Sequence, residues 1–270
     1  MPLVFGCVAP HGSQALPELA PSAEEGAVTR KAMAELGRRL EQLHPDTVIV
    51  LTPHGIRIEG AICISVSERA AGEMGPDVSV DFEVDQETAR ALARATEAKG
   101  VPVARVIYGA SSGPGCNLPL DWGAIIPLRH MGHTYTPKPR VIVVCPSRTL
   151  SLNQMVAFGQ AIGEVAQASG KRIALIASAD QGHAHSAAGP YGLHPAAAVY
   201  DQQIVDVVKA DDLMRLLQFD PKLVEDAKPD SLWQMLILAG AQTVVPMKGA
   251  LLSYEVPTYF GMLCAAYLPK

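Results

Sequence analysis

The sequence lacks the features that mark membrane-spanning, secreted and nucleic-acid-binding proteins. No apolar run approaches the roughly 20 residues that a transmembrane helix needs. The start, Met1-Pro-Leu-Val, has no basic segment of a signal peptide, so a cytoplasmic location is expected. The net charge is −5 without a basic cluster, which argues against a nucleic-acid partner. The five cysteines form no C-x2-C pair, which argues against a zinc ribbon or a disulfide framework.

The remaining composition and pattern are typical of one α/β domain. The 270 residues are 49% hydrophobic, and no linker rich in Pro, Gly and Ser divides residues 1–270. Apolar strand patterns alternate with amphipathic helix patterns, which predicts a mainly parallel central sheet flanked by helices. We expect a smaller antiparallel pairing between strands 61–66 and 78–84, joined by a glycine-rich turn over 67–76. Other strands are predicted at 3–9, 48–51, 103–107, 140–145, 173–177, 243–245 and 249–254, and helices at 23–43, 85–99, 122–131, 151–169 and 195–210. Residues 258–268 fit a final helix or strand.

Two strand patterns end in the same tripeptide, Pro-His-Gly, which contains His11 in the first strand and His54 in the second. Proline stops each strand and glycine allows a tight turn after the histidine. Ligands of open α/β sheets bind at the carboxyl ends of strands, so two histidines placed there are candidates to share a metal ion. The alternative is that both are surface turn residues, and it stays open because the sequence does not show whether the two strands are neighbours.

Other polar residues follow predicted strands. Glu255 ends the last of them, and two histidines with one carboxylate are the ligand set of oxygen-activating non-haem Fe(II). A solvated glutamate at a strand end is the competing interpretation. The segment after strand 173–177 contains Asp180, His183 and His185, where a histidine near a metal can transfer protons and Asp180 can orient it. We expect the loops 108–120 and 182–191 to line a substrate pocket, because long loops in compact domains are often functional.

These motifs together resemble the class III extradiol ring-cleavage dioxygenases, the superfamily of the protocatechuate 4,5-dioxygenase β-subunit, over essentially the full length. Ala-Pro-His11-Gly and Thr-Pro-His54-Gly are similar to the segments that carry that family's two iron histidines. Tyr-Glu255-Val-Pro is similar to the segment that carries its iron glutamate, and Ser-Ala-Asp180-Gln-Gly-His183 resembles Ser-Gly-Asp-Leu-Ser-His, which carries its acid/base histidine. The stretch from Leu120 to Leu128 resembles Leu-Asp-His-Gly-x-x-x-Pro-Leu, with Trp122 in place of the histidine.

The resemblance implies an enzyme that inserts both atoms of O2 into a catechol-like or aminophenol-like ring. It implies Fe(II), with Zn or Mn as alternatives, bound by His11, His54 and Glu255. His183 would be the acid/base residue, with His185 as the alternative and Asp180 in support. Substrate contacts are expected from Asp121, Trp122, Tyr191 and His194. The expected partners are a small aromatic substrate and O2, without nucleic acid or membrane, in a homo-oligomer.

Two other functions compete with this interpretation. Mediator-of-cell-motility proteins resemble the same fold and are best known as binding partners, although retention of two histidines and a glutamate favours an enzyme. A zinc hydrolase could use the same ligands with a bound water. The sequence does not define the aromatic substrate, the position of cleavage, or the need for a small second subunit.

Overall fold

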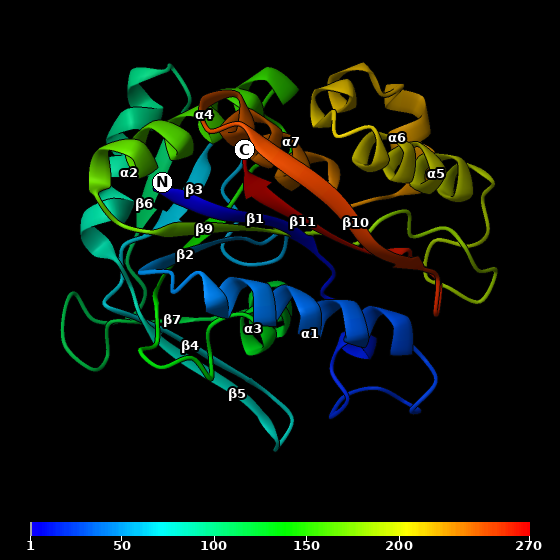
Figure 1. The fold of residues 1–270 in the computed structure, drawn as a ribbon, viewed down its shortest axis with the longest axis horizontal. Coiled ribbons are helices and arrows are strands. Elements are labelled where there is room, and N and C mark those ends of the chain that lie inside the picture. Colours follow the sequence, from blue (N-terminus) through cyan, green and yellow to red (C-terminus); the bar gives the residue numbers. More distant parts are fainter. Residues whose placement is uncertain (1) are drawn as a thin grey trace.

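A mixed, mainly parallel sheet of eight strands forms the centre of the protein, whose computed structural model describes residues 2–270 (Figure 1). The strand order is β10-β11-β1-β9-β2-β8-β3-β6, and β1, β9, β2 and β8 run parallel to one another. This arrangement confirms the predicted fold class. The strands of this sheet are β1 (Leu3–Ala9), β2 (Thr47–Leu51), β3 (Ile62–Ser65), β6 (Val103–Val106), β8 (Arg140–Cys145), β9 (Ile173–Ser178), β10 (Met247–Glu255) and β11 (Met262–Pro269).

Helices cover both faces of this sheet, which explains why its central strands are almost continuously apolar. Side chains alternate between faces, so Ile49 and Leu51 pack with α2, α4, α5 and α7, whereas Val48 and Val50 pack with α1 and α3. The helices are α1 (Ala27–Gln42), α2 (Gln86–Ala98), α3 (Trp122–His130), α4 (Leu152–Ser169), α5 (Ala196–Lys209), α6 (Pro221–Ala227) and α7 (Leu232–Val244), with short 3-10 helices at Ser13–Ala15 and Leu213–Gln218.

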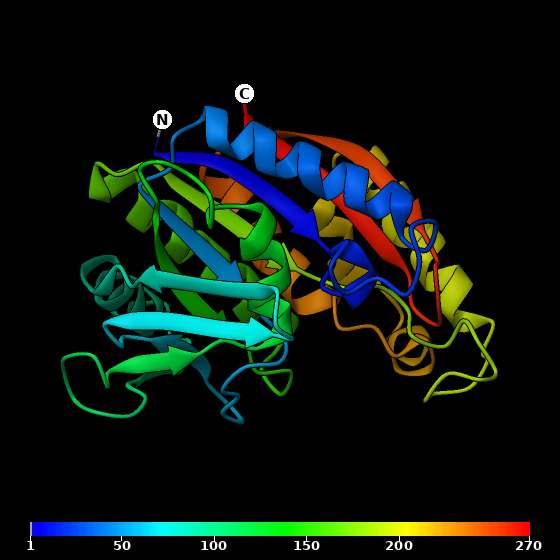
Figure 2. The ribbon, with the colours of Figure 1, turned by 90° about the horizontal axis from the view of Figure 1, so that it is seen from below.

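A second, three-stranded sheet lies beside the large one, on the side of α3 (Figure 2). Its order is β5 (Val78–Glu83), β4 (Arg69–Met74) and β7 (Asn117–Pro119), and β4 pairs antiparallel with β5 and parallel with β7. An antiparallel pairing of strand 78–84 was predicted, but with strand 61–66, and that partner is wrong. β5 pairs instead with β4, which lies in the segment 67–76 that was expected to be a turn. Only the bend at Gly75, with φ of 68°, is a turn. The composition of β4 is poor in β-branched residues, so pairing overrides weak strand propensity.

The C-terminal part also differs from expectation in two places. The predicted strand at 243–245 is largely the end of α7, which runs to Val244. The tail, expected as a helix or a strand, is β11, which inserts antiparallel between β1 and β10. This insertion separates β10 from β1, and it determines which residues of the strand ends can meet. Within residues 2–270, no helix combines the length and apolar character needed to cross a membrane.

Asp85 is a buried structural carboxylate at the start of α2, with only 1% of its surface exposed. It caps the helix by accepting from the backbone N–H of Thr88 at 3.2 Å. It also accepts from the hydroxyl of Thr47 at 2.7 Å and from Nζ of Lys171 at 2.9 Å. Burial would raise its pKa, but these donors outweigh burial and lower the pKa below its ordinary value.

We expect Asp85→Ala to lower the free energy of unfolding by about 3 kcal/mol, because a helix cap and a largely buried ion pair are lost together. Since the folded-state pKa is depressed, the contribution of Asp85 is present above the unfolded pKa of about 3.9 and is lost as the pH falls through the folded pKa. Urea unfolding at pH 7 measures the loss. The exposed Asp77→Ala variant is the control, and equal stability of the two variants would contradict the assignment.

Candidate metal centre and aromatic cavity

The two Pro-His-Gly histidines meet because their strands flank a common neighbour. β1 and β2 both pair in parallel with β9, so the three carboxyl ends lie at one edge of the sheet. Strands two positions apart are about 10 Å from each other, a gap that two inward-pointing imidazoles can span. The Nε2 atoms of His11 and His54 lie 3.0 Å apart, and the two rings are nearly perpendicular, with an interplanar angle of 85°. The two histidines that the motif singled out therefore lie side by side in the structure.

Ser178, at the end of β9, sets the orientation and tautomer of His11. Its hydroxyl donates to the carbonyl oxygen of Gly123 at 2.5 Å, which uses its one hydrogen. The same oxygen lies 2.9 Å from Nδ1 of His11 and must therefore accept from Nδ1–H. In the neutral imidazole this places the lone pair on Nε2, the atom that faces His54. A histidine whose second nitrogen donates to the protein is the usual arrangement for a metal ligand.

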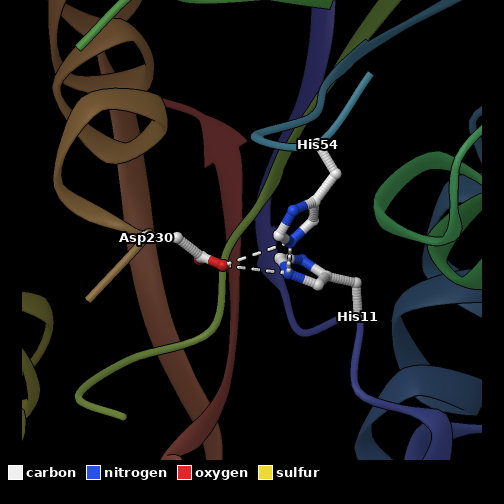
Figure 3. A group of neighbouring side chains, drawn as sticks. All are labelled: His11, His54 and Asp230. Atoms are coloured by element: carbon white, nitrogen blue, oxygen red, sulfur yellow. Dashed lines mark hydrogen bonds and ion pairs between the residues drawn. The ribbon is translucent and has the colours of Figure 1, made fainter. Parts of the chain in front are cut away.

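Asp230 joins the two histidines from the turn that precedes α7 (Figure 3). Its Oδ1 accepts from the backbone N–H of Asp180 at 2.9 Å, which fixes the carboxylate. Its Oδ2 lies 3.1 Å from Nε2 of His11 and 3.4 Å from Nε2 of His54. Among the described residues, His11, His54 and Asp230 form the group whose possible ligand atoms all lie within 4.8 Å of one another.

The three donor atoms form a triangle with the dimensions of one face of a metal coordination shell. Its edges are 3.0, 3.1 and 3.4 Å. Ligand atoms about 2.1 Å from one ion lie about 3.0 Å apart at right angles and about 3.4 Å apart at tetrahedral angles. Two histidines and one carboxylate on one face are also a donor set that suits a divalent transition metal. The residues present therefore fit a metal ion.

The electrostatics of the group also favour a bound cation. The carboxylates of Asp180 and Asp230 are nearly fully buried beside His11. Burial would lower the pKa of His11, but these two charges raise it to about 9. Burial would raise the pKa of Asp230, but the charge of His11 keeps it well below its ordinary value. Carboxylates buried this close together need a nearby positive charge. A metal ion can supply that charge in place of the proton on His11.

Glu255 does not lie with the histidines, in contrast to the sequence-based expectation. Its Oε1 accepts from the backbone N–H of Thr29 at 2.6 Å, in the first turn of α1. The N-cap residue of that helix, Gly26, offers no side chain, and the first turn contains no acidic residue. Glu255 therefore supplies the negative charge and the acceptor that a helix N-terminus favours. Because β11 lies between β10 and β1, the end of β10 is two strands away from His11.

His183 lies beside the group, in a cavity of about 430 Å³. Its Nε2 is 3.9 Å from Oδ2 of Asp230, and its ring stacks on Phe260 with centroids 5.3 Å apart. Burial lowers the pKa of His183 below its ordinary value, which favours the neutral ring. Trp122, which also lines the cavity, stacks on His54 with ring centroids 4.3 Å apart. The cavity is lined by His11, Gly12, Ser13, Gln14, His54, Met74, Trp122, Asp180, His183, Tyr191, Tyr259 and Phe260.

The other predicted site residues lie outside this cavity. Asp121 accepts from the hydroxyl of Thr52 at 2.6 Å, below the turn that carries His54. His194 is exposed, and its Nδ1 accepts from the N–H of Ala196 at the start of α5. His185 does not line the cavity, and its Nε2 donates to the carboxylate of Asp201 at 2.8 Å. Residues 108–120 contribute nothing to the cavity lining, whereas the loop 182–191 contributes His183 and Tyr191.

Sequence reasoning missed Asp230, Ser178 and the two aromatic residues of the β10–β11 connection, Tyr259 and Phe260. Asp230 precedes Ser231 and an apolar helix, which is the pattern of a helix cap. The sequence therefore gave no reason to interpret this aspartate as a metal ligand. Ser178 directly follows a buried strand, and that position was the available signal for it. Tyr259 and Phe260 come close to the histidines only because β11 returns beside β1.

Comparison with known proteins identifies the family and a shared fold. A family model described as the catalytic LigB subunit of aromatic ring-opening dioxygenase matches residues 6–262. A curated relative, Protein CA_C1420 of Clostridium acetobutylicum, is 23% identical over 251 residues, or 91% of this chain. The chain spans 53% of that relative, about half its length. The crystal structure of the uncharacterized protein JW3007 from Escherichia coli K12 matches 97% of this chain and 99% of its own, with a TM-score of 0.66 and 13% identity, which shows a shared fold.

Proposed function

Because the chain belongs to the family of the catalytic LigB subunit of aromatic ring-opening dioxygenases, we propose that it is an Fe(II)-dependent extradiol dioxygenase acting on a catechol-like or aminophenol-like ring. The observation that supports this most directly is the triangle formed by Nε2 of His11, Nε2 of His54 and Oδ2 of Asp230. Such a set leaves adjacent positions open for a chelating ring and dioxygen. The chemistry that Fe(II) supplies when bound is electron transfer between the two substrates.

The cavity walls are suited to hold a flat ring. Two stacked pairs contribute to its lining, His54 with Trp122 and His183 with Phe260. Trp122 is 48% exposed, so its ring is available to a ligand as well as to His54. Aromatic pairs contribute about 0.5–1.5 kcal/mol beyond the area they bury. We therefore assign ring binding to these walls and chelation to the open side of the triangle.

His183 is the residue of this cavity that can move a proton. Its Nε2 lies near the triangle but outside hydrogen-bond distance of Asp230, which leaves the atom free for a ligand. A neutral imidazole first accepts a proton from a ring hydroxyl and later returns it to a leaving oxygen. Asp180, which accepts from the backbone N–H of His11 at 3.1 Å, holds the first histidine in place during this transfer.

The proposal is tested by oxygen uptake after anaerobic reconstitution with Fe(II). A panel of catechols and o-aminophenols should include a ring that consumes one O2 per molecule and gives a coloured ring-opened product. The same protein loaded with Zn(II) is the matched control and should consume no oxygen. Uptake in neither preparation, across the whole panel, would contradict the dioxygenase assignment.

A zinc hydrolase remains the alternative that the same donor set supports, since two histidines, a carboxylate and one water form a catalytic zinc site. It predicts the reverse result, with Zn(II)-dependent release of product from ester or amide substrates in the absence of oxygen. A non-enzymatic binding protein predicts neither activity.

A further inference from the structure

Asp201 of α5 is a buried carboxylate that ties together three separate segments near the cavity. It is 1% exposed. Its Oδ1 accepts from the backbone N–H of Gly182 at 2.7 Å, and its Oδ2 accepts from Nε2 of His185 at 2.8 Å and from the hydroxyl of Tyr254 at 2.7 Å. A Cβ atom at Gly261 would overlap this carboxylate, so the backbone of the β10–β11 connection also packs directly against it.

Two of these donors flank His183 in the chain. Gly182 precedes it and His185 follows two residues later, so one carboxylate holds the segment on both sides of His183. Backbone hydrogen bonds also hold this segment, among them that of the N–H of His185 to the carbonyl of Tyr259 at 3.1 Å. The N–H of His183 donates to the carbonyl of Ala227 at 2.8 Å, and the N–H of Gly261 donates to the carbonyl of Gly182 at 3.1 Å.

The ring of His183 depends on these ties for its position. Among residues 2–270, its buried Nδ1 has no hydrogen-bond partner. Its Nε2 has Asp230 at 3.9 Å, beyond the range of a hydrogen bond. What remains is packing against the rings of Phe260, Tyr259 and Tyr191, which limits rotation of the imidazole but gives it no hydrogen bond. The location of Nε2 is therefore set mainly by where the backbone from Gly182 to His185 is held.

We propose that Asp201 is a positioning residue that places His183 for proton transfer at the metal centre. The assignment rests on the proposed function of His183. The carboxylate does not contact the cavity, so it acts only through the segment that it holds. A purely structural role for Asp201 would lower stability without a selective effect on the proton-transfer step, and the two roles are separable by experiment.

Asp201→Asn is the direct test because it keeps the size of the side chain and one carbonyl oxygen for Gly182. The second oxygen becomes an amide N–H₂, which no longer accepts from His185 and Tyr254. Misplacement of a catalytic group by about 1 Å costs roughly 100-fold in rate. We expect kcat for the best catechol of the panel to fall roughly 10- to 100-fold, with KM and the Kd for Fe(II) unchanged within about twofold. Asp206→Asn, on the exposed side of the same helix, is the matched control and should leave kcat unchanged.

A double-mutant cycle with His183→Ala separates positioning from general damage. If Asp201 acts through His183, Asp201→Asn should have no further effect on kcat once His183 is alanine. Additive losses in the double variant would overturn the proposal. If Asp201→Asn does not fold, His185→Ala and His185→Gln replace it, because glutamine restores an N–H donor to Asp201. Loss of kcat in the first and recovery in the second support the proposal, and equal kcat values overturn it.

A measurement that needs no turnover tests the position of His183 independently of the proposed function. In NMR spectra of Zn(II)-loaded protein with labelled histidine, the ring signal of His183 is assigned by its absence in His183→Ala. We expect that signal to shift or broaden in Asp201→Asn and to stay unchanged in Asp206→Asn. If no catechol is turned over, the proposed function fails, but an altered His183 signal still supports the positioning role. An unchanged signal overturns it.

Discussion

Asp230→Asn is expected to abolish stoichiometric metal binding, whereas Glu255→Gln is expected to retain it. Asparagine keeps the oxygen that accepts from the backbone N–H of Asp180, so the turn before α7 stays intact. It replaces the anionic oxygen that faces His11 and His54, and with it one of the three proposed ligands. Loss of a hydrogen-bond partner of a ligand already weakens metal binding about 10- to 100-fold, so loss of a ligand should exceed that range.

Metal content after anaerobic loading with Fe(II), followed by gel filtration, measures this difference. The change at Glu255 acts elsewhere, because that carboxylate accepts from Thr29 at the start of α1. We expect Glu255→Gln to cost about 0.5–1 kcal/mol of stability, as is typical for a charge lost from a helix N-terminus. Metal retained by Asp230→Asn and lost by Glu255→Gln would reverse the ligand assignment.

His183→Ala is expected to reduce turnover by about 10²–10⁴-fold, which is the usual contribution of a general acid–base residue. The variant should keep its Fe(II), because His183 Nε2 is 3.9 Å from Asp230 and outside the triangle of ligand atoms. It should also bind a catechol, since Trp122 and the triangle remain. Single-turnover kinetics together with metal analysis separate these effects.

Alanine variants of two other histidines in the same segment are the comparisons for His183→Ala. His194→Ala should leave turnover unchanged, because His194 is exposed and lies at the start of α5 outside the cavity. His185→Ala should lower turnover by less than His183→Ala, because His185 acts only through Asp201. A larger loss in His185→Ala than in His183→Ala would show that the proton is carried by a different histidine.

The sequence predicted those parts of the site that follow from local patterns. His11 and His54 were found because each ends an apolar strand in Pro-His-Gly, and His183 because it follows a third strand. Because β9 lies between β1 and β2, the residues that follow these three strands lie close together. The fold class followed in the same way from alternating strand and helix patterns, which report burial directly.

The third member of the triangle depended on strand order, which local patterns do not contain. Glu255 ends a strand at the same edge of the sheet, but the insertion of β11 moves it away from His11 and brings it to α1. Asp230 lies in a turn between two helices, and its position comes from the packing of α7 against the sheet. The strand β4 was missed for a related reason, since its partners rather than its composition define it.

The antiparallel pairing of β1 with β11 also places the two ends of the chain near each other (Figure 1), at the opposite end of β1 from His11. Gly6 pairs with Tyr267, and continuing that register puts residue 270 opposite residue 3. β1 then runs about 20 Å from Leu3 before it reaches His11. A short peptide can therefore join the two ends, and a circularly permuted protein opened within residues 109–115, outside the cavity lining, would retain every residue of the metal centre in place.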